Sequence, residues 1–228
     1  MIFFRKAVLI IHGYAGGTYD LENLSNYLER RCSLDVYSFT LPGHTKLSLK
    51  TTKYTEWIEE AENMVELLKS YGYRKIYVVG HSMGGVIATY LATKYKCIKK
   101  VVLAAPAFDY MVSGDKISDK IKGGINMLKG NSTGEVITRF LKLPISSINE
   151  FKKLVENYNK CYLGVSVPVL IVHGDNDSVV PIQSSIDVYN SLKTSKKKFV
   201  KIEGATHDIF CDSLSKQIIE IDTFLWKY

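Results

Sequence analysis

Short apolar segments alternate along the chain with longer amphipathic ones. The first, Ala7-Val8-Leu9-Ile10-Ile11, contains no polar residue, which is typical of a strand buried on both faces of a parallel sheet. Five later segments have a similar character. The predicted strands span residues 7–11, 35–40, 75–79, 100–104, 167–172 and 198–202.

Between the strands, apolar residues recur at every third or fourth position and predict amphipathic helices. In the stretch 54–70, for example, Trp57, Ala61, Val65 and Leu68 share one helical face. Regular alternation of strands and helices indicates an α/β fold, with a doubly wound, mainly parallel sheet of about six strands. The predicted helices span residues 19–30, 54–70, 86–95, 181–192 and 214–226.

The interval before the fifth strand is too long for a simple crossover. About 60 residues separate it from the fourth strand, where a dozen or more would suffice. Apolar spacing predicts a helix over 146–162, and a weaker pattern around Gly123-Gly124 indicates another over 117–128. We therefore expect a small helical cap at 109–164, inserted into a single domain that spans 1–228. The alternative is a pair of ordinary crossover helices with no role near a site.

The composition fits one globular domain. Of the 228 residues, 46% are hydrophobic and 23% are charged, which excludes disordered, collagen-like and coiled-coil proteins. No apolar run approaches the roughly 20 residues of a membrane-spanning helix, and the first residues lack the pattern of a signal peptide. We expect no integral membrane segment, and a monomer or small homo-oligomer.

The net charge of +7 includes lysine groups at Lys94, Lys96, Lys99 and Lys100 and at 196–198. Both groups flank predicted strands without a nucleic-acid-binding motif, so we interpret them as solvated surface and expect no nucleic-acid partner. The four cysteines are scattered, which predicts reduced thiols, a cytoplasmic location and no zinc site. Neither GxGxxG nor a P-loop occurs, so we expect no metal and no nucleotide or flavin cofactor.

A candidate nucleophile lies in the sequence Gly80-His81-Ser82-Met83-Gly84. This GxSxG sequence follows a predicted strand directly and precedes a predicted helix, which is the setting of a nucleophile elbow. A serine at such a sharp turn adopts a strained backbone, and side chains two positions before and after it would collide with neighbouring backbone. Ser82 is therefore the candidate nucleophile.

A serine nucleophile requires a base to take its proton and an acid to orient that base. With this kind of elbow the chain order is Ser, then Asp or Glu, then His, and only His173 and His207 follow Ser82. His173 comes at the end of a predicted strand, and the acidic residues Asp175 and Asp177 follow it by only two and four positions. His207, in contrast, lies in a loop after the last strand. We take His207 as the base. Asp175 and Asp177 are both candidate acids, and their spacing does not choose between them.

Together these motifs resemble the α/β-hydrolases, specifically the small carboxylesterase and monoacylglycerol-lipase-like proteins, over nearly the whole chain. The family's motifs are the His-Gly oxyanion motif, the elbow, the acid motif HGxxDxxVP and a final Gly-x-x-His. They are matched by His12-Gly13-Tyr14-Ala15-Gly16-Gly17, by 80–85, by 173–181 and by 204–207.

The resemblance implies that Asp177 is the acid and that Asp175 is a loop residue. Such proteins often have Gly-His-Gly after the second strand, where this chain has Gly43-His44-Thr45, so we assign no function to that loop. The resemblance also leads us to expect that two N-terminal strands of larger members are absent.

Acyl transfer also needs an oxyanion hole, in which two backbone N–H groups face the developing negative charge. The resemblance assigns these groups to Met83 and to Tyr14, which follows His12-Gly13. Tyr14 is also a candidate for substrate contact. An expected strand order of 2-1-3-4-5-6 would place Tyr14 and Ser82 at the crevice where doubly wound sheets bind ligands.

These residues predict a serine hydrolase that cleaves carboxylic esters of short to medium acyl chains through an acyl-enzyme on Ser82. A carboxylesterase or monoacylglycerol lipase fits best, with a small-molecule ester as substrate. An acyl-thioesterase or acyltransferase would use the same residues, and a ligand receptor is the alternative outside enzymes. The cap is expected to form a modest acyl pocket, lined by Ile121, Leu128, Phe140 and Phe151.

Overall fold

The computed structural model describes residues 6–30, 34–45, 49–109, 144–210 and 216–227. These residues contain a six-stranded sheet in which every neighbouring pair is parallel, in the order β2-β1-β3-β4-β5-β6. This confirms the predicted strand order and the doubly wound architecture. The strands are β1 (Lys6–Ile11), β2 (Leu34–Phe39), β3 (Lys75–His81), β4 (Ile98–Ala104), β5 (Val169–Gly174) and β6 (Lys197–Ile202).

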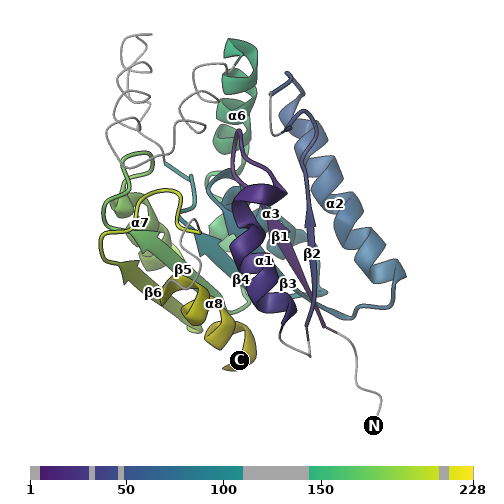
Figure 1. Ribbon diagram of the computed structural model, residues 1–228, viewed down its shortest axis with the longest axis vertical. Coiled ribbons are helices and arrows are strands. Elements are labelled where there is room, and N and C mark those ends of the chain that lie inside the picture. The colour runs from purple at the N-terminus through teal and green to yellow at the C-terminus, as the bar shows by residue number, and fades with distance from the viewer. Residues whose placement is uncertain (1–5, 31–33, 46–48, 110–143, 211–215, 228) are drawn as a thin grey trace.

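Helices cover both faces of the sheet (Figure 1). One face carries a 3₁₀ turn (Thr18–Leu21), α1 (Glu22–Glu29) and α8 (Lys216–Lys227). The other face carries α2 (Tyr54–Ser70), α3 (Met83–Lys94), α6 (Ile145–Tyr158), a second 3₁₀ turn (Cys161–Gly164) and α7 (Ile182–Ser191). The sheet is therefore the middle layer of three, as its apolar strands predict.

Strand β1 contributes to the hydrophobic cores on both faces. Successive side chains of a strand point to opposite faces, so Ala7, Leu9 and Ile11 join the core beneath α2 and α3. Val8 and Ile10 join the core beneath α1 and α8. All five side chains are 0% exposed, which explains why the segment contains no polar residue.

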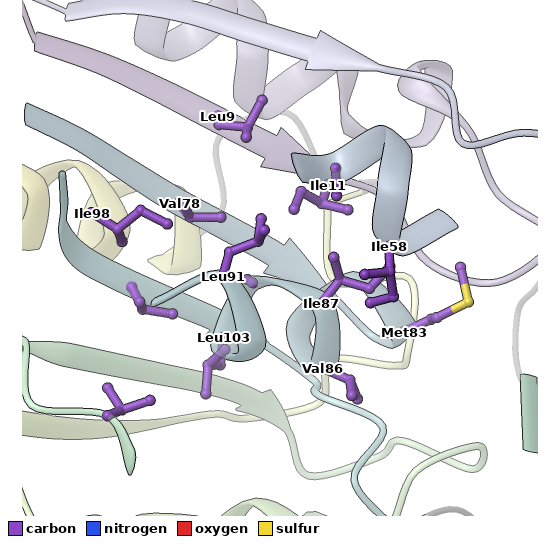
Figure 2. Close-up of a cluster of buried hydrophobic side chains, with 14 of the residues drawn as sticks. Leu9, Ile11, Ile58, Val78, Met83, Val86, Ile87, Leu91, Ile98 and Leu103 are labelled. Atoms are coloured by element: carbon purple, nitrogen blue, oxygen red, sulfur yellow. The ribbon is translucent and has the colours of Figure 1, made fainter. Parts of the chain in front are cut away.

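Helix α3 lies over the middle of the sheet. Figure 2 shows Leu91 of α3 between Val78 of β3 and Leu103 of β4, with Ile87 one turn earlier in α3. Each of these four side chains is at most 1% exposed. Burying a side chain of this size contributes about 1.5–3 kcal/mol. The core therefore holds the first turn of α3 firmly at the end of β3.

Helix α3 begins at Met83, earlier than the predicted start at residue 86. Gly84 and Gly85 are poor helix formers, so helix propensity conceals this first turn. A Cβ at Gly84 would collide with the backbone of Ile11, so glycine allows the turn to lie against β1. Tertiary packing overrides the weak local preference.

The predicted cap is described only in its last part. The predicted helix over 117–128, with Ile121 and Leu128, lies outside the described residues, as does Phe140. The predicted helix over 146–162 is found as α6 and the separate 3₁₀ turn. Because α6 packs against both α2 and α3, this part of the interval is tied to the domain core. The cap itself stays a prediction.

Lys100 is not part of a solvated lysine group, and that interpretation is wrong for this residue. Lys100 is 2% exposed, because strand alternation points its side chain towards α8. Its Nζ donates hydrogen bonds to the carbonyl oxygens of Phe224 (3.2 Å) and Leu225 (2.6 Å). The ring of Tyr77 lies 4.7 Å from the same Nζ. A cation here satisfies carbonyl groups in the last turn of α8.

Burial, with a smaller effect from the charge of Lys6, lowers the pKa of Lys100 from 10.5 to about 8. Between these two pH values the unfolded chain retains a proton that the folded chain has lost, so the free energy of unfolding rises with pH. We expect this gain, on the order of 2 kcal/mol, in the difference between the wild type and Lys100→Met. Denaturant unfolding across the same pH window measures it, and a difference independent of pH would contradict the buried cation.

Candidate active site

Ser82 lies at the turn between β3 and α3, and its backbone is strained. Its φ of 52° and ψ of −117° are rare for any residue other than glycine. A Cβ at Gly80 would collide with the backbone of Gly84, and a Cβ at Gly84 would collide with that of Ile11. The two glycines of the GxSxG sequence therefore leave room for the turn that presents Ser82 at the carboxyl end of β3.

The structure brings His207 and Asp177 into line with Ser82. Nε2 of His207 lies 3.0 Å from Oγ of Ser82, and Nδ1 of His207 lies 2.7 Å from Oδ2 of Asp177. Asp177 follows β5 and His207 follows β6, so both side chains approach from the carboxyl edge of the sheet. Because an ionised carboxylate only accepts, Nδ1 of His207 carries the hydrogen and the Nε2 lone pair faces the hydroxyl of Ser82.

The Asp177 carboxylate is buried, with a side chain that is 0% exposed. Its Oδ1 accepts the backbone N–H groups of Val179 (2.8 Å) and Val180 (2.9 Å). Burial opposes ionisation, but the attraction of His207 and hydrogen bonds from His173 and His207 outweigh it. The pKa of Asp177 is therefore held well below its usual range.

The charge of Asp177 acts in turn on His207. Burial alone would lower the pKa of His207, but the charge and hydrogen bond of Asp177 outweigh it and raise that pKa above 6.5. An imidazole with a raised pKa holds a transferred proton more readily. The pair is therefore suited to accept a proton from the hydroxyl of Ser82.

Asp175 does not contact His207 and has a different task. Its Oδ1 accepts the N–H of Gly204 at 2.7 Å, and its Oδ2 lies 3.2 Å from Nζ of Lys201. Gly204 has a φ of 72°, a conformation that favours glycine. Asp175 thus fastens the loop after β5 to the loop that carries His207.

His81 supports the same loop from the nucleophile side. Its Nε2–H donates to the carbonyl oxygen of His207 at 2.9 Å, and the two ring centroids are 5.1 Å apart. Burial and the charge of His207 lower the pKa of His81 to about 4. His81 is therefore neutral at pH 7 and holds the His207 backbone in place.

The loop after β1 passes directly beside Ser82. A Cβ at Gly13 would lie 3.1 Å from Cβ of Ser82, so the loop makes its close approach at a glycine. Tyr14 is the next residue of this loop. Met83 is the first residue of α3, where a backbone N–H has no acceptor within the helix. Both residues expected to form the oxyanion hole thus adjoin the close contact between Gly13 and Ser82.

The Tyr14 side chain contacts α6. Its ring stacks on Phe151, with centroids 4.9 Å apart and planes at 12°. Its hydroxyl donates to Oγ of Ser147 at 3.0 Å. Burial raises the pKa of Tyr14 to about 12, so the phenol stays protonated. Sequence reasoning did not find Ser147, because nothing local in the sequence marks a contact across 133 positions.

The assembled site offers a hydroxyl, an oriented imidazole and a buried carboxylate. In the ranges that the structure describes, no three His, Cys, Asp or Glu side chains are grouped so that they could hold a metal ion. Nor does any described helix have the length and apolar character to cross a membrane.

Two family models match the sequence. One, described as alpha/beta hydrolase fold, matches residues 6–129, and another, described as serine aminopeptidase, S33, matches residues 137–213. Among curated proteins, a carboxylesterase of Bacillus subtilis (strain 168) is 24% identical, with 96% of this chain and 91% of the relative covered. A thermostable monoacylglycerol lipase of Bacillus sp. (strain H-257) is also 24% identical, covering 93% of this chain and 87% of the relative.

Solved structures agree on the fold. A structure described with LipS and LipT, two metagenome-derived lipolytic enzymes, has a TM-score of 0.80 at 19% identity and covers 99% of this chain and 95% of that one. A monoacylglycerol lipase of Paleococcus ferrophilus has a TM-score of 0.70 at 20% identity, covering 96% and 93%. With its parallel sheet, its strained serine turn and a family model that matches more than half of its residues, the chain belongs to the α/β-hydrolase fold family.

Proposed function

We propose that this chain is a serine hydrolase that cleaves carboxylic esters, with Ser82 as nucleophile, His207 as general base and Asp177 as the acid that orients it. One observation carries the proposal: hydrogen-bond distances of 3.0 and 2.7 Å connect Ser82, His207 and Asp177 in an unbroken line. Relatives named carboxylesterase and monoacylglycerol lipase support ester cleavage.

The first half of the reaction transfers the acyl group to the enzyme. Nε2 of His207 takes the hydroxyl proton of Ser82 while Oγ attacks the ester carbonyl carbon. The resulting oxyanion lies against the N–H groups of Tyr14 and Met83. His207 then gives its proton to the departing alcohol oxygen, which leaves an acyl-enzyme on Ser82.

Water completes the cycle. Nε2 of His207 takes a proton from a water molecule, whose oxygen attacks the acyl carbon. When the tetrahedral intermediate collapses, the proton returns to Oγ of Ser82 and the carboxylic acid departs. Asp177 remains ionised throughout, because its low pKa and its hydrogen bonds stabilise the charged form.

Release of p-nitrophenolate from p-nitrophenyl butyrate tests this proposal directly. A folded wild-type chain that releases none would favour a ligand receptor on a hydrolase scaffold. An acyl-thioesterase or acyltransferase would instead show faster turnover with an acyl thioester, or transfer to an added alcohol. Competition assays with these substrates distinguish the reaction types.

We expect the rate to rise with acyl length and then to fall, with the best substrate between about butyrate and decanoate. Each buried methylene contributes about 0.8 kcal/mol, so kcat/KM should increase severalfold per carbon until the pocket is full. A series of p-nitrophenyl esters measures this profile. Equal rates on acetate, octanoate and palmitate esters would mean that the cap interval forms no acyl pocket.

A cytoplasmic location also remains a proposal. Cys97 and Cys161 are free thiols in the structure, which supports a reducing compartment. We expect a monomer or a small homo-oligomer, and light scattering would measure the oligomeric state.

A further inference from the structure

A second histidine contacts the carboxylate that faces His207. His173, near the end of β5, is 0% exposed. Its Nε2 lies 3.1 Å from Oδ2 of Asp177, the same oxygen that accepts from His207, and 3.0 Å from the carbonyl oxygen of Val180. His173 opens the HGxxDxxVP sequence, but the reaction proposed above gives it no task.

The partners of His173 define the direction of its hydrogen bonds. The carbonyl of Val180 and the ionised Asp177 only accept, so Nε2 of His173 carries a hydrogen that it shares between them. Nδ1 of His173 lies 2.6 Å from Oγ of Ser185 on α7, and Ser185 is also 0% exposed. A serine hydroxyl can donate to a ring nitrogen, so Ser185 donates to Nδ1 and holds the imidazole with its Nε2–H towards Asp177.

We propose that His173, held by Ser185, is a positioning residue that orients Asp177 and moderates its pull on His207. The inference rests on the proposed roles of Asp177 and His207. With Oδ1 bound by two backbone N–H groups and Oδ2 by two imidazoles, the carboxylate has no free direction in which to rotate.

Sharing Oδ2 also changes the proton affinity of His207. A second N–H donor stabilises the negative charge of Asp177, so this oxygen attracts the proton on His207 less strongly than it would alone. His173 thus keeps the pKa of His207 closer to neutral pH, where a general base is most effective. Among the described residues, His81 and Asp208 also act on His207, and the variants below leave both in place.

Glutamine and methionine at position 173 provide a matched pair. Their side chains have nearly the same length, but only glutamine carries an N–H group that can replace the Nε2–H of His173. We expect His173→Met to raise the pKa of His207 by about half a unit or more, measured by NMR titration of its imidazole. We expect kcat to fall about tenfold, with KM changed less than twofold, and His173→Gln to recover both values.

Two serine variants test the same link without altering the ring. Ser185→Ala removes the donor to Nδ1 and so weakens Nε2–H as a donor, which should move the pKa of His207 in the same direction by a smaller amount. Ser184→Ala is the control, because Oγ of Ser184 accepts the N–H of Asp109 instead. We expect no change in the titration of His207 in this variant. This pair gives the answer if His173→Met does not fold.

Two results would overturn the inference. One is an unchanged His207 titration in both His173→Met and Ser185→Ala. The other is an equal loss of kcat in the methionine and glutamine variants, which would reduce His173 to a packing residue. The titration requires no substrate, so a wild type without esterase activity would count against the proposed function and leave the link between His173 and His207 measurable.

Discussion

Replacing Ser82 with alanine is expected to abolish covalent labelling by a fluorophosphonate probe and to reduce hydrolysis of p-nitrophenyl butyrate by several orders of magnitude. The probe reacts with a serine whose proton has an acceptor, and the Nε2 of His207 lies 3.0 Å from Oγ of Ser82. Loss of the nucleophile in a comparable triad costs about 10⁶-fold in kcat. A small residual rate from the oxyanion hole and from substrate binding is expected to survive.

The fold of this variant provides the control. A φ of 52° at position 82 is equally unfavourable for alanine and for serine, so the thermal unfolding temperature should change little. Peptide mapping of the labelled wild type identifies the modified residue. Labelling at any other serine, or esterase activity that persists in folded Ser82→Ala, would remove Ser82 from the proposed mechanism.

The second large effect is expected from Asp177→Asn, at about 10⁴-fold in kcat. The amide oxygen would still accept the N–H groups of Val179 and Val180, which turns the amide nitrogen towards His207. That nitrogen donates, so Nδ1 of His207 must accept and its hydrogen moves to Nε2. The imidazole would then be unable to take the proton of Ser82.

Asp175→Asn is the matched control for Asp177→Asn. An asparagine oxygen can still accept from Gly204, and the lost charge faces the exposed Lys201, so we expect less than about a tenfold effect. Steady-state kinetics on both variants, with circular dichroism to verify folding, gives the comparison. If Asp175→Asn were the more damaging of two folded variants, the proposed acid would be the wrong one.

Much of the sheet is predictable because its signal is local. The unbroken apolar segment 7–11 and the GxSxG sequence between a strand and a helix each carry their structural cause within a few residues. The beginning of α3 is not predictable in this way, because Gly84 and Gly85 conceal the helix and only the fit of Gly84 against Ile11 explains it.

Contacts between residues far apart in the chain decide two questions that the local sequence does not answer. Spacing along the chain does not separate Asp175 from Asp177, since the choice depends on which carboxylate the loop turns towards His207. The local sequence predicts a surface lysine at position 100, because the carbonyl partners of Lys100 lie more than a hundred positions away, in α8. Both answers follow from tertiary contacts that no local pattern encodes.

The loops that meet at Ser82 follow β1, β3, β5 and β6, so the site exists only after distant parts of the chain have come together. Neither of the stretches matched separately by the family models, 6–129 and 137–213, contains the proposed nucleophile together with the proposed acid and base. Parallel pairing requires long crossovers whose closure entropy must be overcome first, which makes such contacts late events in folding. The proposed ester hydrolysis is therefore expected to report completed folding, and a refolding chain should recover its helical signal before it recovers turnover.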